Sequence, residues 1–257
     1  MKLKDKVVFI TGSTLHTGYG IAQHCLQEGA LVVLNGIKHE EVATAADQLR
    51  KETNGKIIEA HGDISKENDV IRIFGTIERE AGKLDILILN ACHLGVGPNF
   101  IDLSLQLWDD VIGVNVRGMF LCGQQAARMM RDNGGGTIVT VGSVQGLRGS
   151  RNRSAYIASK GAVESCTRAM ALDLAAFNIR VNMVVPGYIH TSRWDDLKPE
   201  AIDIRRGNLP LGKEVEYEDI AKAILFLSTS DSRNITGASI VVDGGLSMQL
   251  LPSQRDV

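Results

Sequence analysis

The sequence predicts a single α/β domain with a doubly wound parallel sheet of seven strands and helices on both faces. Short apolar runs of four to six residues alternate with longer segments that have the helical period. Continuous apolar runs of this length are typical of strands that are buried on both faces. The chain has 257 residues, which suits one large α/β domain. We therefore expect residues 1–257 to form one domain.

The expected elements follow one another in a regular order. Strands are expected at residues 7–11, 31–34, 57–60, 86–89, 137–141, 180–185 and 239–242. Helical periodicity between them begins with residues 20–28 and 40–53. Strand and helix alternation of this kind predicts parallel strands with helices on both faces. One irregular stretch, residues 191–217, is rich in Asp, Arg, Pro and Gly, and we expect it to be a substrate lid.

Composition and charge argue against several classes of protein. Hydrophobic residues make up 44% and charged residues 23% of the chain, which is typical of a folded protein and not of a disordered one. A net charge of −2 gives no general attraction for nucleic acid or for anionic lipid. The four cysteines are scattered, and the histidines lack the spacing of a metal site. With no signal-peptide core and no long apolar run, we expect a cytoplasmic protein that binds neither membrane nor metal.

A glycine-rich loop, Thr11-Gly-Ser-Thr-Leu-His-Thr-Gly-Tyr-Gly20, joins the first expected strand to the first expected helix. This context is required for binding a pyrophosphate at a helix N-terminus. Gly12 can form the tight turn, whereas Gly18 and Gly20 allow close approach of the backbone and of the helix. The loop therefore predicts a Rossmann-like dinucleotide site.

Tyr156 and Lys160 are four residues apart in an expected helix, so their side chains share one face. Bringing the pKa of a tyrosine from ~10 to about 7 requires roughly 4 kcal/mol of stabilisation of the phenolate. A unit charge about 4 Å away, at an effective dielectric constant of about 20, supplies roughly this amount. We therefore expect Lys160 to make Tyr156 a proton donor and acceptor near neutral pH.

With Ser143 in an upstream loop, this pair resembles the catalytic residues of the short-chain dehydrogenase/reductase family. Six further motifs stand in the family's order and spacing: Thr11-Gly12 to Gly20, Asp63, Asn90-Ala91, Asn115, Pro186-Gly187-x-x-x-Thr191, and Ile235-Thr236-Gly237 to Asp243-Gly244-Gly245. The glycine loop departs from the family, because five residues separate Gly12 from Gly18 where the usual pattern has three. A stretched loop resembles the enoyl reductase branch, but that branch spaces its Tyr and Lys more widely.

The resemblance implies an NAD(P)-dependent oxidoreductase that interconverts a carbonyl and a secondary alcohol by hydride transfer. It implies that Ser143 bonds the substrate oxygen, that Tyr156 exchanges its proton, and that Lys160 holds the ribose and lowers the tyrosine pKa. Asn115 resembles the asparagine that holds a water of the proton relay. The implied cofactor-binding residues are Gly12, Thr14, Gly18, Tyr19, Lys38, Asp63, Ile64, Asn90, Ala91, Tyr156, Lys160, Pro186, Gly187, Ile189 and Thr191.

The end of the second expected strand favours NADP(H), although NAD(H) stays open. NAD enzymes commonly place an acid there to bind the ribose diol, but this chain has Gly36 at the corresponding position. Without the carboxylate a 2′-phosphate is not repelled, and Lys38 would attract it, with His16 as a weaker contributor. The alternative is that Lys38 is a solvated lysine beside the acids at positions 40 and 41.

The expected substrate is small and polar, of the sugar, polyol or hydroxy acid type. By resemblance, the substrate is bordered by Ser143, Gln145, Arg153, Tyr156 and His93. Arginine pairs with carboxylate or phosphate through a planar fork, so Arg153 makes an anionic substrate a hypothesis. The two other arginines of this loop, at positions 148 and 151, are expected to face solvent or a neighbouring subunit.

Two alternatives to this function stay open. One is a reductase of the 3-oxoacyl-[acyl-carrier-protein] type, and the other is a catalytically silent protein that senses the cofactor. The intact set of Asn115, Ser143, Tyr156 and Lys160 favours an enzyme. The resemblance also implies a homotetramer, formed through two long helices and the C-terminal strand. Cys92 replaces the glycine that usually follows Asn-Ala, and we expect it to have a packing role.

Overall fold

The computed structural model describes residues 1–249, apart from the side chain of Arg193. Its seven strands form one sheet in the order β3-β2-β1-β4-β5-β6-β7, and every neighbouring pair is parallel. The strands are β1 (Val7–Ile10), β2 (Leu31–Leu34), β3 (Lys56–Glu59), β4 (Ile86–Leu89), β5 (Gly136–Val141), β6 (Ile179–Pro186) and β7 (Ser239–Val242). The predicted seven-stranded parallel sheet is confirmed, and no strand boundary differs from its prediction by more than one residue.

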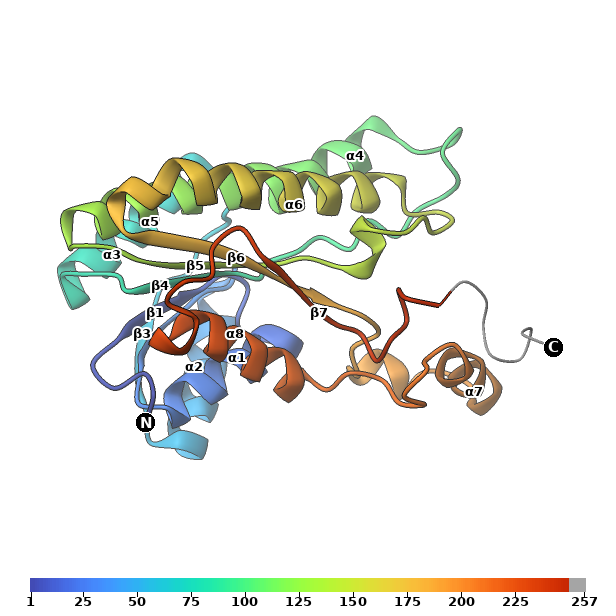
Figure 1. The fold of residues 1–257 in the computed structure, drawn as a ribbon, viewed down its shortest axis with the longest axis horizontal. Coiled ribbons are helices and arrows are strands. Elements are labelled where there is room, and N and C mark those ends of the chain that lie inside the picture. Colours follow the sequence, from blue (N-terminus) through green and yellow to red (C-terminus); the bar gives the residue numbers. More distant parts are fainter. Residues whose placement is uncertain (250–257) are drawn as a thin grey trace.

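Helices cover both faces of the sheet (Figure 1). One layer contains α1 (His16–Gln27), α2 (His39–Thr53) and α8 (Tyr217–Ser228), and the other contains α3 (Glu67–Ala81), α5 (Met119–Asp132) and α6 (Ser154–Leu174). The remaining helices are α4 (Leu105–Ile112) and α7 (Pro199–Gly207), with short turns η1 (Gly113–Gly118), η2 (Val144–Gly146), η3 (Ala175–Phe177), η4 (Ser192–Trp194) and η5 (Ser230–Ser232). The doubly wound arrangement is therefore confirmed.

Strands β1 to β6 contribute side chains to both cores, whereas the edge strand β7 contributes only to the core beneath α1, α2 and α8. In β1, Val8 and Ile10 belong to the core beneath α1, α2 and α8, whereas Val7 and Phe9 belong to the core beneath α3, α5 and α6. This division follows from the two-residue period of a strand, which points successive side chains to opposite faces. Because both faces are covered, the central strands β1 and β4 are apolar throughout, and this explains why they were visible in the sequence.

Helix boundaries were less predictable than those of the strands. The first helix begins at His16, four residues before the predicted start, because the end of the glycine loop already has helical geometry. Residues 191–217 contain η4, α7 and irregular turns, and they end where α8 begins. Residues 250–257, the end of the predicted single domain, lie outside the described residues.

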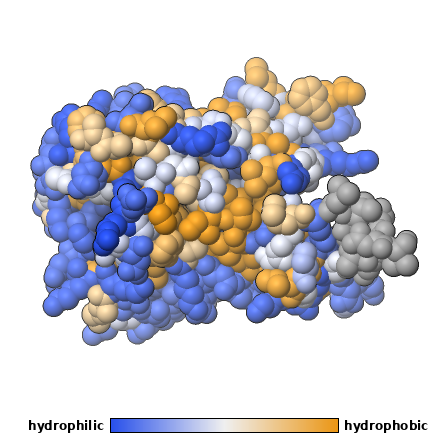
Figure 2. All heavy atoms as spheres, viewed as in Figure 1, coloured by the Kyte–Doolittle hydropathy of each residue, from blue (hydrophilic) through white to orange (hydrophobic). Residues whose placement is uncertain are grey.

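Within residues 1–249, no helix is long and apolar enough to cross a membrane. One edge of the sheet is formed by β7, where Val241 is 41% exposed. Figure 2 shows apolar side chains gathered near the centre of the face that carries this strand. An edge strand with an apolar surface is a place where a second chain can pack.

Candidate active site

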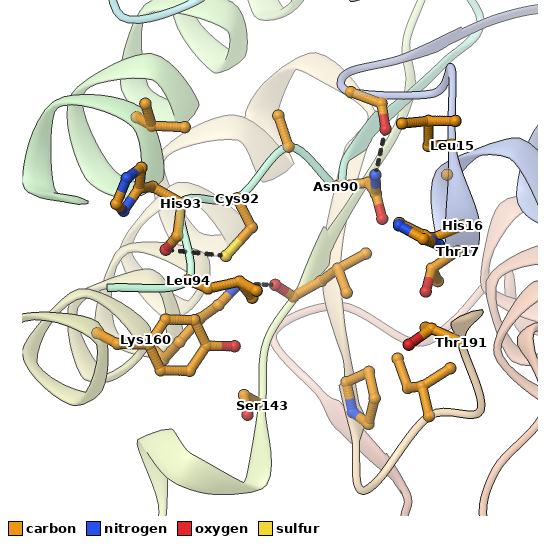
Figure 3. Close-up of a pocket in the computed structure, with 18 of the residues that line it drawn as sticks. Leu15, His16, Thr17, Asn90, Cys92, His93, Leu94, Ser143, Lys160 and Thr191 are labelled. Atoms are coloured by element: carbon orange, nitrogen blue, oxygen red, sulfur yellow. Dashed lines mark hydrogen bonds between the residues drawn. The ribbon is translucent and has the colours of Figure 1, made fainter. Parts of the chain in front are cut away.

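The carboxyl ends of the strands surround a large pocket of about 870 Å³, near the upper end of the range of about 300–1,000 Å³ for ligand sites. Figure 3 shows Leu15, His16 and Thr17 at one end of it and His93, Lys160 and Ser143 at the other. Predicted site residues that line it are Gly12, Thr14, Gly18, Asp63, Ile64, Asn90, Ala91, His93, Ser143, Gln145, Arg153, Tyr156, Lys160, Pro186, Gly187, Ile189 and Thr191. The fold thus brings together residues from five loops.

The glycine loop needs its glycines for reasons of packing. Gly12 has a φ of +61°, and a Cβ there would lie 2.8 Å from the Cα of Ala91. A Cβ on Gly18 would lie 2.6 Å from the Asn90 Nδ2 and would collide with the carbonyl oxygen of Gly12. The Asn90 amide donates to that same oxygen at 2.8 Å. These contacts place the N-terminus of α1 against the pocket, as expected for anion binding.

Asn35, at the end of β2, is a site-building residue that sequence reasoning missed. It is 2% exposed. Its Oδ1 accepts a hydrogen bond from the backbone of Gly12 at 3.1 Å, and its Nδ2 donates to the carbonyl oxygens of Ala60 and Gly62 at 2.9 and 3.2 Å. One side chain thus joins the glycine loop to the ends of β2 and β3. The available signal was an asparagine directly after a buried strand, where its amide can satisfy backbone groups.

At the expected ribose end, Gly36 lies against the glycine loop. A Cβ at this position would lie 2.7 Å from the Cγ2 of Thr14, so an acid here would have to displace that side chain. Lys38 is exposed, and its Nζ lies 2.8 Å from the Oε1 of Glu41. Glu41 lines the pocket, whereas Lys38 does not. The Oδ1 of Asp63 accepts hydrogen bonds from the backbone and the hydroxyl of Ser65.

Three predicted site residues do not line the large pocket: Tyr19, Lys38 and Asn115. The Tyr19 hydroxyl donates to Glu52 at 2.9 Å, and the pKa of Tyr19 is raised by burial and by this carboxylate. The cofactor roles of Tyr19 and Lys38 stay predictions. Asn115 borders a smaller cavity together with Lys160, as described below.

Tyr156 and Lys160 are brought together on one face of α6, as their spacing predicted. They are 8% and 5% exposed, and the Lys160 Nζ lies 5.7 Å from the centroid of the tyrosine ring. The Nζ also donates to the carbonyl oxygen of Val141 at 2.8 Å, which holds the ammonium beside the loop after β5. The Ser143 side chain is within hydrogen-bonding reach of the Tyr156 phenol, and its Oγ accepts from the backbone of Gln145 at 3.2 Å.

The pKa of Tyr156 differs from the expectation. Burial raises it above its ordinary value of 10.0, whereas the charge of Lys160 and the hydrogen bond to Ser143 act in the opposite direction. The sequence argument counted the attraction of the ammonium but omitted the cost of burying a phenolate. Burial lowers the pKa of Lys160, but its neighbours Cys92 and Tyr156 outweigh this effect, so the net shift is upward. The pair is therefore a protonated phenol beside a charged ammonium.

Asn115 lies in the π-helical turn η1, a geometry that is common at functional sites. Its Oδ1 accepts from the backbone of His93 at 2.7 Å, and its Nδ2 donates to the His93 carbonyl and to Ser159. A small cavity of about 10 Å³ is bordered by Asn115 and Lys160. This is close to the minimum volume of about 10–15 Å³ that holds one water.

Cys92 lines this end of the pocket. Its thiol donates to the His93 carbonyl at 3.5 Å (Figure 3). It is also within hydrogen-bonding reach of Tyr156 and Lys160, and it acts to raise the pKa of both. The expected packing role of Cys92 stays a prediction.

The predicted lid also lines the pocket, through Tyr188 just before it and through Thr191, Trp194, Leu197 and Arg205 within it. The indole of Trp194 is 5% exposed and donates from its Nε1 to the Ile189 carbonyl at 2.9 Å. Sequence reasoning did not identify Trp194 or Arg205, because a stretch without periodicity gives no indication of which side chains face inward. In the loop between Ser143 and Tyr156, Arg148 donates a hydrogen bond to the Ser247 carbonyl, and Arg151 is exposed.

Comparisons with known proteins identify a family and relatives that match most of the chain. A family model described as "Enoyl-(Acyl carrier protein) reductase" matches residues 8–247. The chain is 37% identical over 251 residues to a glucose 1-dehydrogenase of Gluconobacter oxydans (strain 621H), covering 96% of this chain and 94% of the relative.

Two solved structures are similar over nearly the whole chain. A short-chain type dehydrogenase/reductase from Mycobacterium marinum is 32% identical with a TM-score of 0.90, covering 96% of this chain and 98% of the other. A gluconate 5-dehydrogenase from Burkholderia cenocepacia J2315, solved in complex with NADP and tartrate, is 29% identical with a TM-score of 0.91, covering 97% and 98%.

These likenesses determine the reaction class. The relatives are named as dehydrogenases, and the likeness extends over at least 96% of this chain. The chain is therefore an oxidoreductase that acts on CH–OH groups and uses a nicotinamide cofactor, NAD or NADP. In sequence and in fold alike, it belongs to the short-chain dehydrogenase/reductase family.

Proposed function

We propose that this enzyme interconverts a small polar carbonyl compound and its secondary alcohol, with NADP(H) favoured over NAD(H). The observation that carries the proposal is the buried pair of Tyr156 and Lys160, with Ser143 beside it, at one end of a pocket whose other end is a glycine-rich helix N-terminus. In this proposal residues 1–257 form one domain, and residues 191–217 form the substrate lid.

The pocket fits a dinucleotide. Residues 14–18 and the N-terminus of α1 line one end of it, and no acid lies in the first turn of that helix. Backbone N–H groups there would face a pyrophosphate. Further along, Asp63 and Ile64 would border the adenine, Asn90 and Ala91 the ribose, and Pro186 and Thr191 the carboxamide. When bound, the nicotinamide supplies or accepts the hydride.

The protein's own groups manage the proton. In carbonyl reduction, the Tyr156 phenol donates its proton to the substrate oxygen, while the Ser143 hydroxyl orients that oxygen. In alcohol oxidation, Tyr156 accepts the proton as phenolate, and the ammonium of Lys160 stabilises this anion. The cavity between Asn115 and Lys160 supports the role of Asn115 in holding a relay water.

The cofactor preference rests on Gly36. No carboxylate side chain stands at this position to bind a ribose diol, and Thr14 occupies the space that such a side chain would need. His16 lines the pocket nearby. The contribution of Lys38 is weaker than expected, because its ammonium is already paired with Glu41. The preference for NADP(H) therefore depends mainly on the missing acid.

The substrate proposal rests on the polar lining near the catalytic pair, where Gln145, His93 and Arg153 border the pocket. The names of two similar proteins, a glucose dehydrogenase and a gluconate dehydrogenase, support a hydroxylated substrate. A carrier-bound 3-oxoacyl substrate is the second candidate, which the acyl-carrier wording of the family model keeps open but does not favour. The four-residue spacing of Tyr156 and Lys160 argues against enoyl reduction.

We also propose a homotetramer. The exposed apolar side chains include Phe120 on α5 and Leu172 on α6, which are 55% and 80% exposed, and the apolar edge of β7 supports a second contact. Helix faces and an edge strand of this kind are stabilised when a second copy covers them. Sedimentation or light scattering of the purified protein tests this assembly.

The experiment that tests the proposed function is a panel of neutral and acidic carbonyls and alcohols, followed by nicotinamide absorbance with each cofactor. Tyr156→Phe should lower turnover by about 10²–10⁴-fold, while cofactor affinity stays within about twofold because the phenol contributes mainly to proton transfer. Tyr217→Phe is the matched control, because its ring lies on α8 and does not line the pocket. Retention of half of the wild-type turnover by Tyr156→Phe would refute the assignment. Cofactor binding without any turnover in the wild type would favour the silent sensor.

A further inference from the structure

The charged side chains that line the pocket are divided by sign. Its acidic residues are Glu41, which follows strand β2, and Asp63, which follows strand β3. Both lie at the glycine-loop end of the pocket. The charged residues toward the catalytic pair are Arg153, Lys160 and Arg205, and no carboxylate among the described residues lines that end. An apolar-walled pocket with charges of one sign attracts ligands of the opposite charge. The catalytic end is therefore suited to an anion.

Arg205 is held in place without using its hydrogen bonds. Its guanidinium carbon lies 5.3 Å from the centroid of the Trp194 ring, within the range of a cation–π contact. Trp194 is itself buried and is anchored through its Nε1 to the Ile189 carbonyl. Stacking uses the face of the guanidinium and leaves its in-plane N–H groups for a ligand. Within the described residues, the Arg205 side chain has no ion pair and no hydrogen bond, whereas its backbone carbonyl accepts one from Asn208.

The neighbouring arginine shows that this arrangement is not general for α7. Arg206 binds Glu214 through two hydrogen bonds, at 2.9 and 2.7 Å, and Glu214 is 7% exposed. This bidentate pair fixes α7 to the segment before Val215, which bridges Ile189. Arg206 of α7 therefore anchors the helix, while the preceding residue, Arg205, lines the pocket.

A second guanidinium approaches the pocket from the start of α6. Arg153 donates through one nitrogen to the Leu94 carbonyl at 2.7 Å and has no ion pair among the described residues. It stands three positions before Tyr156 in the chain, and both residues line the pocket, so it belongs to the wall beside the reacting oxygen. One hydrogen bond fixes its position and leaves its other N–H groups available.

We propose that the substrate is a small hydroxy or oxo acid, whose carboxylate is bound by Arg205 of the lid together with Arg153. This inference rests on the proposed function and specifies its substrate class. The bound carboxylate then contacts Arg205 of the lid and Arg153 of the wall beside Tyr156. These two contacts orient the reacting carbon toward Tyr156. Charge-assisted hydrogen bonds to a carboxylate fix orientation as well as affinity. An uncharged analogue of the same shape lacks this contact.

The test uses pairs of compounds that differ only in charge: lactate, 3-hydroxybutyrate and gluconate, each with its primary amide. Initial rates with saturating oxidised cofactor give kcat and KM for the full-length enzyme. The same acids are titrated calorimetrically into the enzyme saturated with cofactor. The variants are Arg205→Gln, Arg205→Lys and Arg153→Gln. The matched controls are Lys198→Gln and Arg151→Gln, which remove exposed cations of the same two segments that do not line the pocket.

We expect at least one acid to be preferred over its amide by about tenfold or more in kcat/KM. Arg205→Gln should raise KM for that acid by about 10–100-fold, the effect of losing a hydrogen bond to a charged group. The kcat should change by less than about threefold, and KM for the amide should stay constant. Arg205→Lys, which keeps the charge without the planar fork, should lie in between. The control variants should behave as the wild type.

Other results would overturn the inference. Equal kcat/KM values for acids and their amides would do so. An equal rise of KM for acid and amide in Arg205→Gln, or equal effects of Arg205→Gln and Lys198→Gln, would also do so. So would the absence of calorimetric binding by every acid while neutral alcohols are oxidised. In these cases the oxidoreductase assignment stands. If no compound of the panel is turned over although the cofactor binds, the proposed function itself fails, and the inference fails with it. Thermal denaturation of each variant shows whether the fold is retained.

Discussion

Removal of the Asn35 side chain should affect both stability and cofactor binding. Its amide makes three hydrogen bonds that join the backbone of Gly12 to the ends of β2 and β3. A buried hydrogen bond contributes about 1 kcal/mol net, so Asn35→Ala should lower the free energy of unfolding by about 3 kcal/mol. For a chain of this length, the expected decrease in Tm is about 6–12 °C.

The effect on the cofactor Kd should distinguish Asn35 from a buried asparagine that lies away from the pocket. Asn182 is also fully buried and makes two comparable hydrogen bonds, to Ile235 and Ala238, away from the pocket. Asn182→Ala should therefore lower the free energy of unfolding by about 2 kcal/mol without changing cofactor affinity. In Asn35→Ala the backbone N–H of Gly12 loses its hydrogen-bond partner, so the glycine loop is less ordered before the cofactor binds. The free-energy cost of ordering this loop on binding should raise the cofactor Kd about fivefold, equivalent to roughly 1 kcal/mol.

The assay combines urea denaturation, followed by circular dichroism, with cofactor titration by protein fluorescence under native conditions. Both variants should remain folded at low temperature, because the expected losses are smaller than the stability of a typical domain of about 5–15 kcal/mol. Equal cofactor Kd values for Asn35→Ala and Asn182→Ala would refute the reasoning about the glycine loop. A loss of less than about 1 kcal/mol in Asn35→Ala would refute the stability estimate.

Two further predictions concern the cofactor and the proton. Because a Cβ at Gly36 would collide with Thr14, Gly36→Asp should be combined with Thr14→Ala. Relative to Thr14→Ala alone, the double variant should shift the ratio of kcat/KM for NAD(H) to kcat/KM for NADP(H) toward NAD(H) by about tenfold or more, since a carboxylate repels a 2′-phosphate. A wild type that already prefers NAD(H) would contradict this interpretation. The raised pKa of Tyr156 should make alcohol oxidation, measured as kcat at saturating cofactor, increase with pH in the alkaline range. Lys160→Met should move this increase to higher pH, because the lost ammonium no longer stabilises the phenolate; a move to lower pH would contradict it.

The sheet and the catalytic pair could be predicted because local patterns determine them. A strand that is covered on both faces must be apolar along its length, so β1 and β4 are visible as continuous runs. The four-residue spacing of Tyr156 and Lys160 becomes spatial proximity through helix geometry alone. Neither inference required knowledge of a distant segment. The start of α1 was less predictable, because a glycine loop that bends into a helix has no apolar signal.

What the sequence left undetermined depends on contacts between distant segments. Whether an arginine of residues 191–217 lines the pocket depends on its neighbours. Arg206 is bound by Glu214, whereas Arg205 stacks on Trp194 and lines the pocket. Two adjacent residues of the same type therefore have different environments, which no periodicity in the sequence distinguishes. The pKa of Tyr156 has a similar origin, because burial comes from the surrounding fold while the charge of Lys160 is visible in the motif. In our proposal, substrate specificity therefore depends on tertiary contacts that the sequence does not reveal, whereas the reaction class follows from the family motifs that the sequence contains.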